Sequence, residues 1–199
     1  MQVDNTMKKI SLLFVLFAGL GCGTALADDA ASGVDKRIAA NRQVVQEVFA
    51  ALKGELEKAL EAGGPAGAIS VCKEKVPEIG KRFGKKYPGW RIRRTTLKTR
   101  NPANAPDAWE KQVLEEFEAR KAAGEAPKGI EYSAFVEQDG KRVFRYMKAI
   151  PTLEVCTLCH GSAILPDVVA KLDEMYPEDT ARGFEIGDIR GAFTITQPE

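Results

Sequence analysis

Residues 131–150, EYSAFVEQDGKRVFRYMKAI, are the stretch that decides the fold class. Apolar and polar side chains alternate over residues 131–138, which is typical of a strand with one buried face. Asp139-Gly140 then supplies a strong two-residue turn, and residues 141–150 return with strand-forming side chains. The stretch therefore predicts an antiparallel β-hairpin.

Helices dominate the chain before this hairpin. Apolar residues recur every three or four positions over residues 34–60, and Gly63-Gly64 followed by Pro65 predicts the end of one helix and the start of a second. The second helix contains Pro77, which should kink or split it. The other expected elements are a strand over 90–96, an ordered loop over 100–106, a helix over 107–123, a helix over 166–175 and a strand over 191–196. Helices followed by strands without βαβ crossovers predict an α+β fold with an antiparallel sheet.

The composition is that of one ordinary globular domain. The chain has 199 residues, of which 44% are apolar, and its 29 Lys and Arg nearly balance its 28 Asp and Glu. This balance excludes the broad basic face of a nucleic-acid-binding protein. Because no apolar run reaches the roughly 20 residues that a spanning helix needs, we expect no transmembrane segment in the mature chain.

The first residues have the pattern of a secretory signal peptide. Two lysines precede an apolar run over residues 10–20, and Ala25-Leu26-Ala27 supplies small residues at the cleavage positions. We therefore expect residues 1–27 to be removed after Ala27, leaving residues 28–199 as a single periplasmic domain. Of the four cysteines, the mature domain keeps three, an odd number that cannot all pair within one chain.

The chemistry is concentrated at Cys156-Thr157-Leu158-Cys159-His160. C-x-x-C-H is the attachment sequence of c-type haem: two thiols add to the two vinyl groups of the porphyrin, and the adjacent His binds the iron. Attachment takes place after export, so the signal peptide and the motif support one another. His160 is also the only His in the chain. The sequence predicts one covalently bound haem c.

Three other interpretations fit parts of this residue set. Cys156 and Cys159 could form a surface disulfide, although the position of His160 would then be a coincidence. A thioredoxin-like redox pair needs its cysteines at the start of a helix in a βαβ unit, whereas the next helix is expected only at residue 166. Structural zinc is the strongest alternative, because Cys72, Cys156, Cys159 and His160 form a complete Cys₃His set.

The second axial ligand of the iron is left open by the residues alone. With His160 used, the soft donors of the mature chain are Cys72, Met147 and Met175. Cys72 lies on the expected inward stripe of the second helix. Met147 is expected on the returning strand of the hairpin, and Met175 at the end of the helix over residues 166–175.

Several blocks of the chain resemble one family over most of its length. The blocks are AISVC at 68–72, RTTLKTRNPANAP at 94–106 followed by Trp109-Glu110, CTLCHG at 156–161, YPEDTA at 176–181 with Gly183, and GDIRG at 187–191. The family consists of exported single-haem c-type domains with a PAS-like fold, which also occur as sensing ectodomains of membrane histidine kinases and chemoreceptors.

The resemblance implies a PAS-like antiparallel sheet with long N-terminal helices and a haem docked against the sheet. It also implies Cys/His axial ligation, with Cys72 as the ligating thiol opposite His160. The Arg-rich strand and the Asn-Pro loop would then line the haem pocket, with Arg94 and Arg100 as partners of the haem propionates.

These ligands favour a binding module over an enzyme. Six-coordinate iron leaves no open position for a substrate, and the chain has no second His for acid–base work. We expect a haem module that responds to redox state or to a small gas and passes the change to a redox or signalling protein. The alternative is a periplasmic one-electron carrier.

Overall fold

The computed structural model describes residues 25–199, so the predicted signal peptide at residues 1–27 lies almost wholly outside the described residues. Residues 36–199 form one compact unit, which carries the whole sheet and all the site residues. The helical residues 25–35 belong to the other unit. Within the described range, no helix is both long and apolar enough to span a membrane.

A four-stranded antiparallel sheet is the centre of the fold. Its strands are β1 (Arg91–Thr95), β2 (Glu131–Gln138), β3 (Lys141–Pro151) and β4 (Ile189–Pro198), in the order β1-β4-β3-β2. The β2–β3 hairpin closes on the pair Gln138–Lys141. Asp139 and Gly140 both have positive φ, at 53° and 71°, as a tight hairpin turn requires. The predicted α+β fold with an antiparallel sheet is confirmed.

The N-terminal helix α1 (Ala25–Lys86) is two helical arms joined at a break. Gly64 alone leaves the helical region, with φ 64° and ψ −172°, and Pro65 begins the second arm as expected. The arms contact each other where Glu47 of the first pairs with Lys86 of the second. Pro77 does not split the second arm, since Gly64 is the only non-helical residue inside α1.

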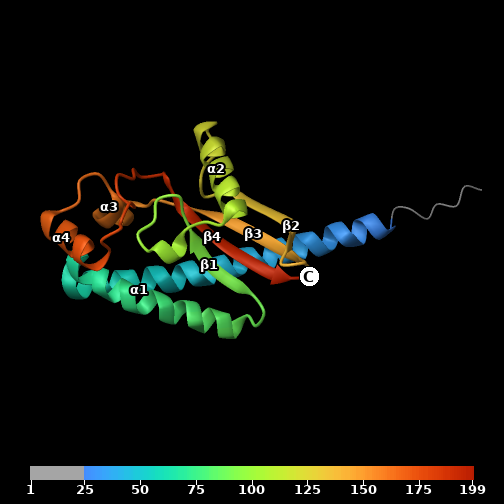
Figure 1. Ribbon diagram of the computed structural model, residues 1–199, viewed down its shortest axis with the longest axis horizontal. Coiled ribbons are helices and arrows are strands. Elements are labelled where there is room, and N and C mark those ends of the chain that lie inside the picture. Colours follow the sequence, from blue (N-terminus) through green and yellow to red (C-terminus); the bar gives the residue numbers. More distant parts are fainter. Residues whose placement is uncertain (1–24) are drawn as a thin grey trace, which may run out of the picture. The chain divides into compact units, whose positions relative to one another are not determined.

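The two faces of the sheet are covered by different helices (Figure 1). On one face, helix α2 (Ala108–Ala122) contributes Phe117 to a core cluster that also contains Met147 and Ala149 of β3. On the other face, Phe49 of α1 meets Phe193 of β4 edge to face, with ring centroids 6.4 Å apart. Because side chains alternate along a strand, Met147 points away from the α1 face.

A buried polar cluster fixes α2 on its face. Asp107 and Glu110 form a capping box at the start of the helix. Both carboxylates bind Arg145 of β3, and Thr194 of β4 donates a hydrogen bond to Glu110. The pairing satisfies a carboxylate that is only 1% exposed and ties α2 to two strands.

The remaining elements include one that the sequence analysis missed. Helix α4 (Pro166–Met175) has the predicted bounds, and a short 3-10 helix, η1 (Pro102–Asn104), lies inside the expected loop. Helix α3 (Glu154–His160) carries the C-x-x-C-H motif, so the expectation that the first helix after the hairpin begins only at residue 166 was wrong. The helix has only seven residues and none is buried, so it shows no apolar periodicity.

Gly191 allows β1 and β4 to approach closely where the sheet meets the cavity described below. Its φ is 151°, and a Cβ at this position would lie 2.4 Å from the Thr95 carbonyl oxygen. Gly191→Ala is therefore expected to lower the free energy of unfolding by about 1–3 kcal/mol. Gly54→Ala, in an open helical position, is the matched control and should stabilise by about 0.5–1 kcal/mol. Urea unfolding of both variants checks this, and equal stabilities would contradict it.

Candidate cofactor site

One cavity of about 550 Å³ brings the predicted site residues together. Its walls come from both arms of α1, from β1, β3, β4 and η1, from α3, and from the end of α4. The motif residues Cys156, Cys159 and His160 line it, and so do Cys72, Arg94 and Arg100. Residues that are up to 88 positions apart in the sequence thus share one pocket, while their roles stay predictions.

Helix α3 orients the motif. Cys156 and Cys159 are three residues apart on a helix, so both thiols project from the same side, and His160 ends the helix one position later. Both cysteines are free thiols, which leaves the disulfide interpretation without support. Gly161 closes the turn, since a Cβ there would lie 2.6 Å from the Thr157 carbonyl oxygen. The C-x-x-C-H motif by itself does not predict a role for this glycine.

The His160 ring is held in one tautomer. Its Nδ1 lies 2.8 Å from the Ala181 carbonyl oxygen, an acceptor, so Nδ1 carries the proton and donates it. The lone pair is then on Nε2, which faces Nη1 of Arg100 at 3.4 Å. A backbone carbonyl on Nδ1 with Nε2 left as donor atom is the usual arrangement of a metal-binding histidine.

The surroundings also keep this imidazole neutral. Burial lowers the pKa of His160 well below its usual value, and the Arg190 and Arg100 guanidiniums lower it further. A neutral imidazole is the form that binds a metal ion. The neutral form and the tautomer of His160 are thus those that metal-binding histidines have.

Cys72 faces the cavity from the second arm of α1. Burial raises the pKa of its thiol, whereas the nearby Arg94 and Arg100 guanidiniums act in the opposite direction. Burial also raises the pKa of the Cys159 thiol. The Arg100 guanidinium acts to lower this pKa, and the neighbouring Cys72 and Cys156 act to raise it. The three sulfurs therefore belong to one electrostatic environment.

The two methionines are separated by the fold. Met147 is fully buried in the α2-face cluster and does not line the cavity, because it lies on the opposite side of β3. Met175, at the end of α4, does line it. Geometry thus reduces the three open candidates for a second soft ligand to Cys72 and Met175.

Arg94 and Arg100 are in different electrostatic situations. Arg94 has no carboxylate within ion-pair distance among residues 33–199, and burial lowers the pKa of its guanidinium. Arg100 is paired with Asp179, whose side chain is 1% exposed, at 3.1 Å. Of the two, Arg94 is the cation that an anionic group of a bound ligand would neutralise.

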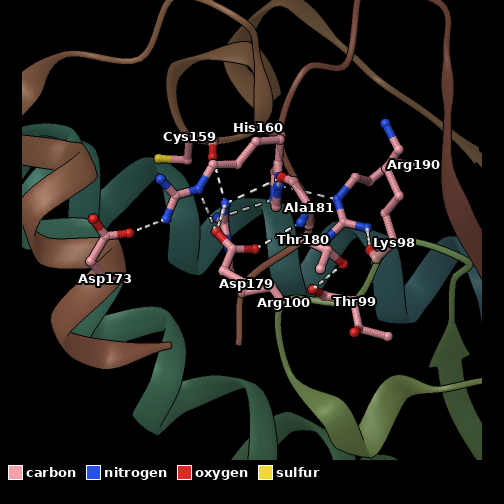
Figure 2. A network of polar contacts seen from close by, with 11 residues as sticks. Lys98, Thr99, Arg100, Cys159, His160, Asp173, Asp179, Thr180, Ala181 and Arg190 are labelled. Atoms are coloured by element: carbon pink, nitrogen blue, oxygen red, sulfur yellow. Dashed lines mark hydrogen bonds and ion pairs between the residues drawn. The ribbon is translucent and has the colours of Figure 1, made fainter. Parts of the chain in front are cut away.

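A polar network joins Arg100 to the end of the C-x-x-C-H helix (Figure 2). Nη2 of Arg100 donates hydrogen bonds to the Cys159 carbonyl oxygen at 2.6 Å and to the Asp179 carboxylate. Asp179 also accepts a hydrogen bond from Arg182 at 3.0 Å. Arg190 approaches His160 from the other side. Asp179 and Arg190 were not assigned roles from the sequence, although both lie in the blocks that carry the family resemblance.

The alternative chemistries find little support in this geometry. Among the side chains of residues 33–199, no group of three or more His, Cys, Asp or Glu is placed to hold a metal ion, so the Cys₃His zinc site is not formed. The cysteines do lie on a helix, but every strand pairing in the described part of the chain is antiparallel, so a thioredoxin-like βαβ unit is lacking.

Comparison with known proteins gives two matches. A family model described as Tll0287-like matches residues 25–198. The crystal structure of the cyanobacterial haem protein Tll0287 superposes with a TM-score of 0.61 at 22% sequence identity, covering 82% of this chain and 96% of that chain. The similarity to this structure shows a shared fold. A comparison with curated proteins found no match.

Proposed function

The chain belongs to the Tll0287-like family, and from this membership we propose that it is an exported domain that binds one haem c covalently and responds to redox state or to a small gas. A structural relative is a haem protein, which supports haem binding here. The single observation that carries the proposal is the shared cavity, in which the two motif thiols, the only His and Cys72 line the same walls.

The residues of the cavity fit a haem. Cys156 and Cys159 would form the two thioether bonds, and His160 would bind through Nε2. Arg94, without a carboxylate partner, would pair with a propionate. Arg100 is the second propionate candidate, although Asp179 already neutralises it. A bound haem would supply an iron that takes up and releases one electron.

The proposed response of the domain to redox state or to a small gas would depend on Cys72. We propose that its sulfur would be the second protein ligand of the iron beside Nε2 of His160, with Met175 as the remaining alternative donor. A thiolate favours ferric iron, so Cys72 would stay bound in that state and be released on reduction or exchanged for a small gas. Because Cys72 lies on the second arm of α1, its release would free one wall of the cavity.

Catalysis is not part of the proposal. His160, the only His of the chain, is committed to the cofactor, which leaves the cavity without an imidazole for acid–base work. The domain would instead act on a redox or signalling protein in the periplasm.

One-electron transport is the second candidate. Leu153 and Leu158 are 36% and 41% exposed on or beside the helix that carries the motif. Exposed apolar side chains next to a redox centre are suited to brief contact with an electron-transfer partner.

Absorption spectra of the purified protein in both oxidation states separate the two candidates. For a sensor, reduction or addition of CO to the ferrous protein should change the axial ligand, since Cys72 is a weak ligand of ferrous iron. For a carrier, the ligands should stay the same in both states. A spectrum that shows no ligand change on reduction and none with CO would reject the sensor function.

A further inference from the structure

We propose that Arg190 is a positioning residue that acts through His160 to raise the reduction potential of the iron site. This inference deepens the proposed function and rests on it, because it concerns the cation beside the proposed iron ligand. Arg190 lies at the start of β4, in the loop-to-strand segment that borders the cavity (Figure 2).

The guanidinium lies against the imidazole edge that faces away from Nε2. Its Nε is 3.2 Å from Nδ1 of His160. Nδ1 faces both this N–H and the Ala181 carbonyl, two partners that require different tautomers. The carbonyl is closer, at 2.8 Å, so Nδ1 carries the proton and donates it there, and Arg190 contributes a nearby positive charge rather than a hydrogen bond to the ring. Arg190 is therefore placed to act on the electron density of this imidazole.

Several contacts fix this position. Nη1 of Arg190 donates to the Thr96 hydroxyl and to the Lys98 carbonyl, both at 3.2 Å. The Arg190 carbonyl in turn accepts from the Thr96 hydroxyl at 2.8 Å. The guanidinium also lies over the Phe184 ring, 5.2 Å from its centroid. These contacts fix both the backbone and the guanidinium of Arg190, so its positive charge stays beside the His160 imidazole.

The charge is both present and unneutralised. Arg190 carries its positive charge at neutral pH, because a guanidinium does not lose its proton in this range. No carboxylate lies within ion-pair distance of it among residues 33–199. In a partly buried site, an uncompensated charge is screened less than at the surface.

Two effects of this cation have the same sign. A positive charge near the iron opposes the additional positive charge of the ferric state. A cation at the Nδ1 edge also counteracts the gain in ligand basicity that the Ala181 carbonyl provides. Both effects disfavour ferric iron and raise the potential, and so they offset part of the lowering by a Cys72 thiolate.

The test is a redox titration of the haem-loaded protein and three variants. Arg190→Gln should lower the midpoint potential, and Arg190→Lys, which keeps the charge, should retain more than half of the difference between wild type and Arg190→Gln. Arg93→Gln is the matched control, because it removes the same charge from β1 on the α2 face, where Arg93 contacts the Ala103 and Ala105 carbonyls. Its potential should equal that of the wild type.

Ferric spectra of the same samples show whether the axial ligands are kept, as we expect. The inference is overturned if Arg190→Gln has the wild-type potential, if Arg190→Lys behaves like Arg190→Gln, if Arg93→Gln shifts equally, or if Arg190→Gln changes the ligand set. If no variant and no wild-type sample carries haem, the proposed function fails and this inference with it. Attached haem with unshifted potentials overturns this inference alone.

Discussion

Replacing both Cys156 and Cys159 with alanine is expected to give a colourless protein with no covalently bound haem. Both thiols line the cavity and project from the same side of α3, so their loss removes every thioether that the motif can form. The cavity of about 550 Å³ would then lack the group that fills it. Because unfilled space in a core is destabilising, we expect a loss of about 3–5 kcal/mol, or roughly 10 °C in Tm.

The measurement is the visible spectrum after acid–acetone extraction, together with thermal unfolding. Leu158→Ser is the matched control: it changes the same helix at an exposed side chain between the two cysteines and should keep the full haem content. A double alanine variant that keeps its colour after extraction would show that these cysteines are not the attachment points.

Replacing Cys72 with serine should leave the haem attached and change its electronic properties. A hydroxyl is a much weaker donor than a thiolate, so the ferric spectrum should lose its thiolate features and the midpoint potential should rise. A rise on the order of 100 mV is reasonable, given that axial ligands set haem potentials over a range of about 0.8 V. Ferric absorption and EPR spectra, with a redox titration, measure both effects.

The fold supplies two controls for this experiment. Met175→Ala removes the other soft donor that lines the cavity, and Met147→Leu changes a methionine on the far face of the sheet. Both should keep the wild-type ferric spectrum. If Cys72→Ser is spectrally unchanged while Met175→Ala is altered, the second ligand is Met175 and the proposed Cys/His pair is wrong.

The parts of the fold that were predicted correctly have local signals. The hairpin turn follows from Asp139-Gly140, the helix break from Gly64 and Pro65, and the start of α4 from Pro166, each of which restricts the backbone by itself. Helix α3 has no such signal, because it is short, has no side-chain cap and buries no residue. Its position depends on contacts with the segment around Ala181 and Phe184.

The candidate site was predictable in its motif but not in its surroundings. C-x-x-C-H marks Cys156, Cys159 and His160 by spacing alone. The Arg100–Asp179 pair joins positions 79 apart, and the approach of Arg190 to His160 spans 30, so neither contact has a signature in the local sequence. Likewise, the exclusion of Met147 required the register that places it on the α2 face.

The PAS-like description and the docking of a haem against the sheet stay predictions. The cavity does border the sheet, through residues of β1, β3 and β4, which is where a group docked on the α1 face would contact the strands. The strand order of the sheet is β1-β4-β3-β2, and a comparison with the strand order of PAS domains would test the PAS-like description.

Intact mass spectrometry of the mature protein, expressed in a host with a cytochrome c maturation system, tests the central claim most directly. The account predicts a denatured polypeptide that begins at Asp28 and is heavier than its own sequence by one haem. A mass equal to that of the bare polypeptide would contradict it, since both cysteines of the motif would then be unmodified.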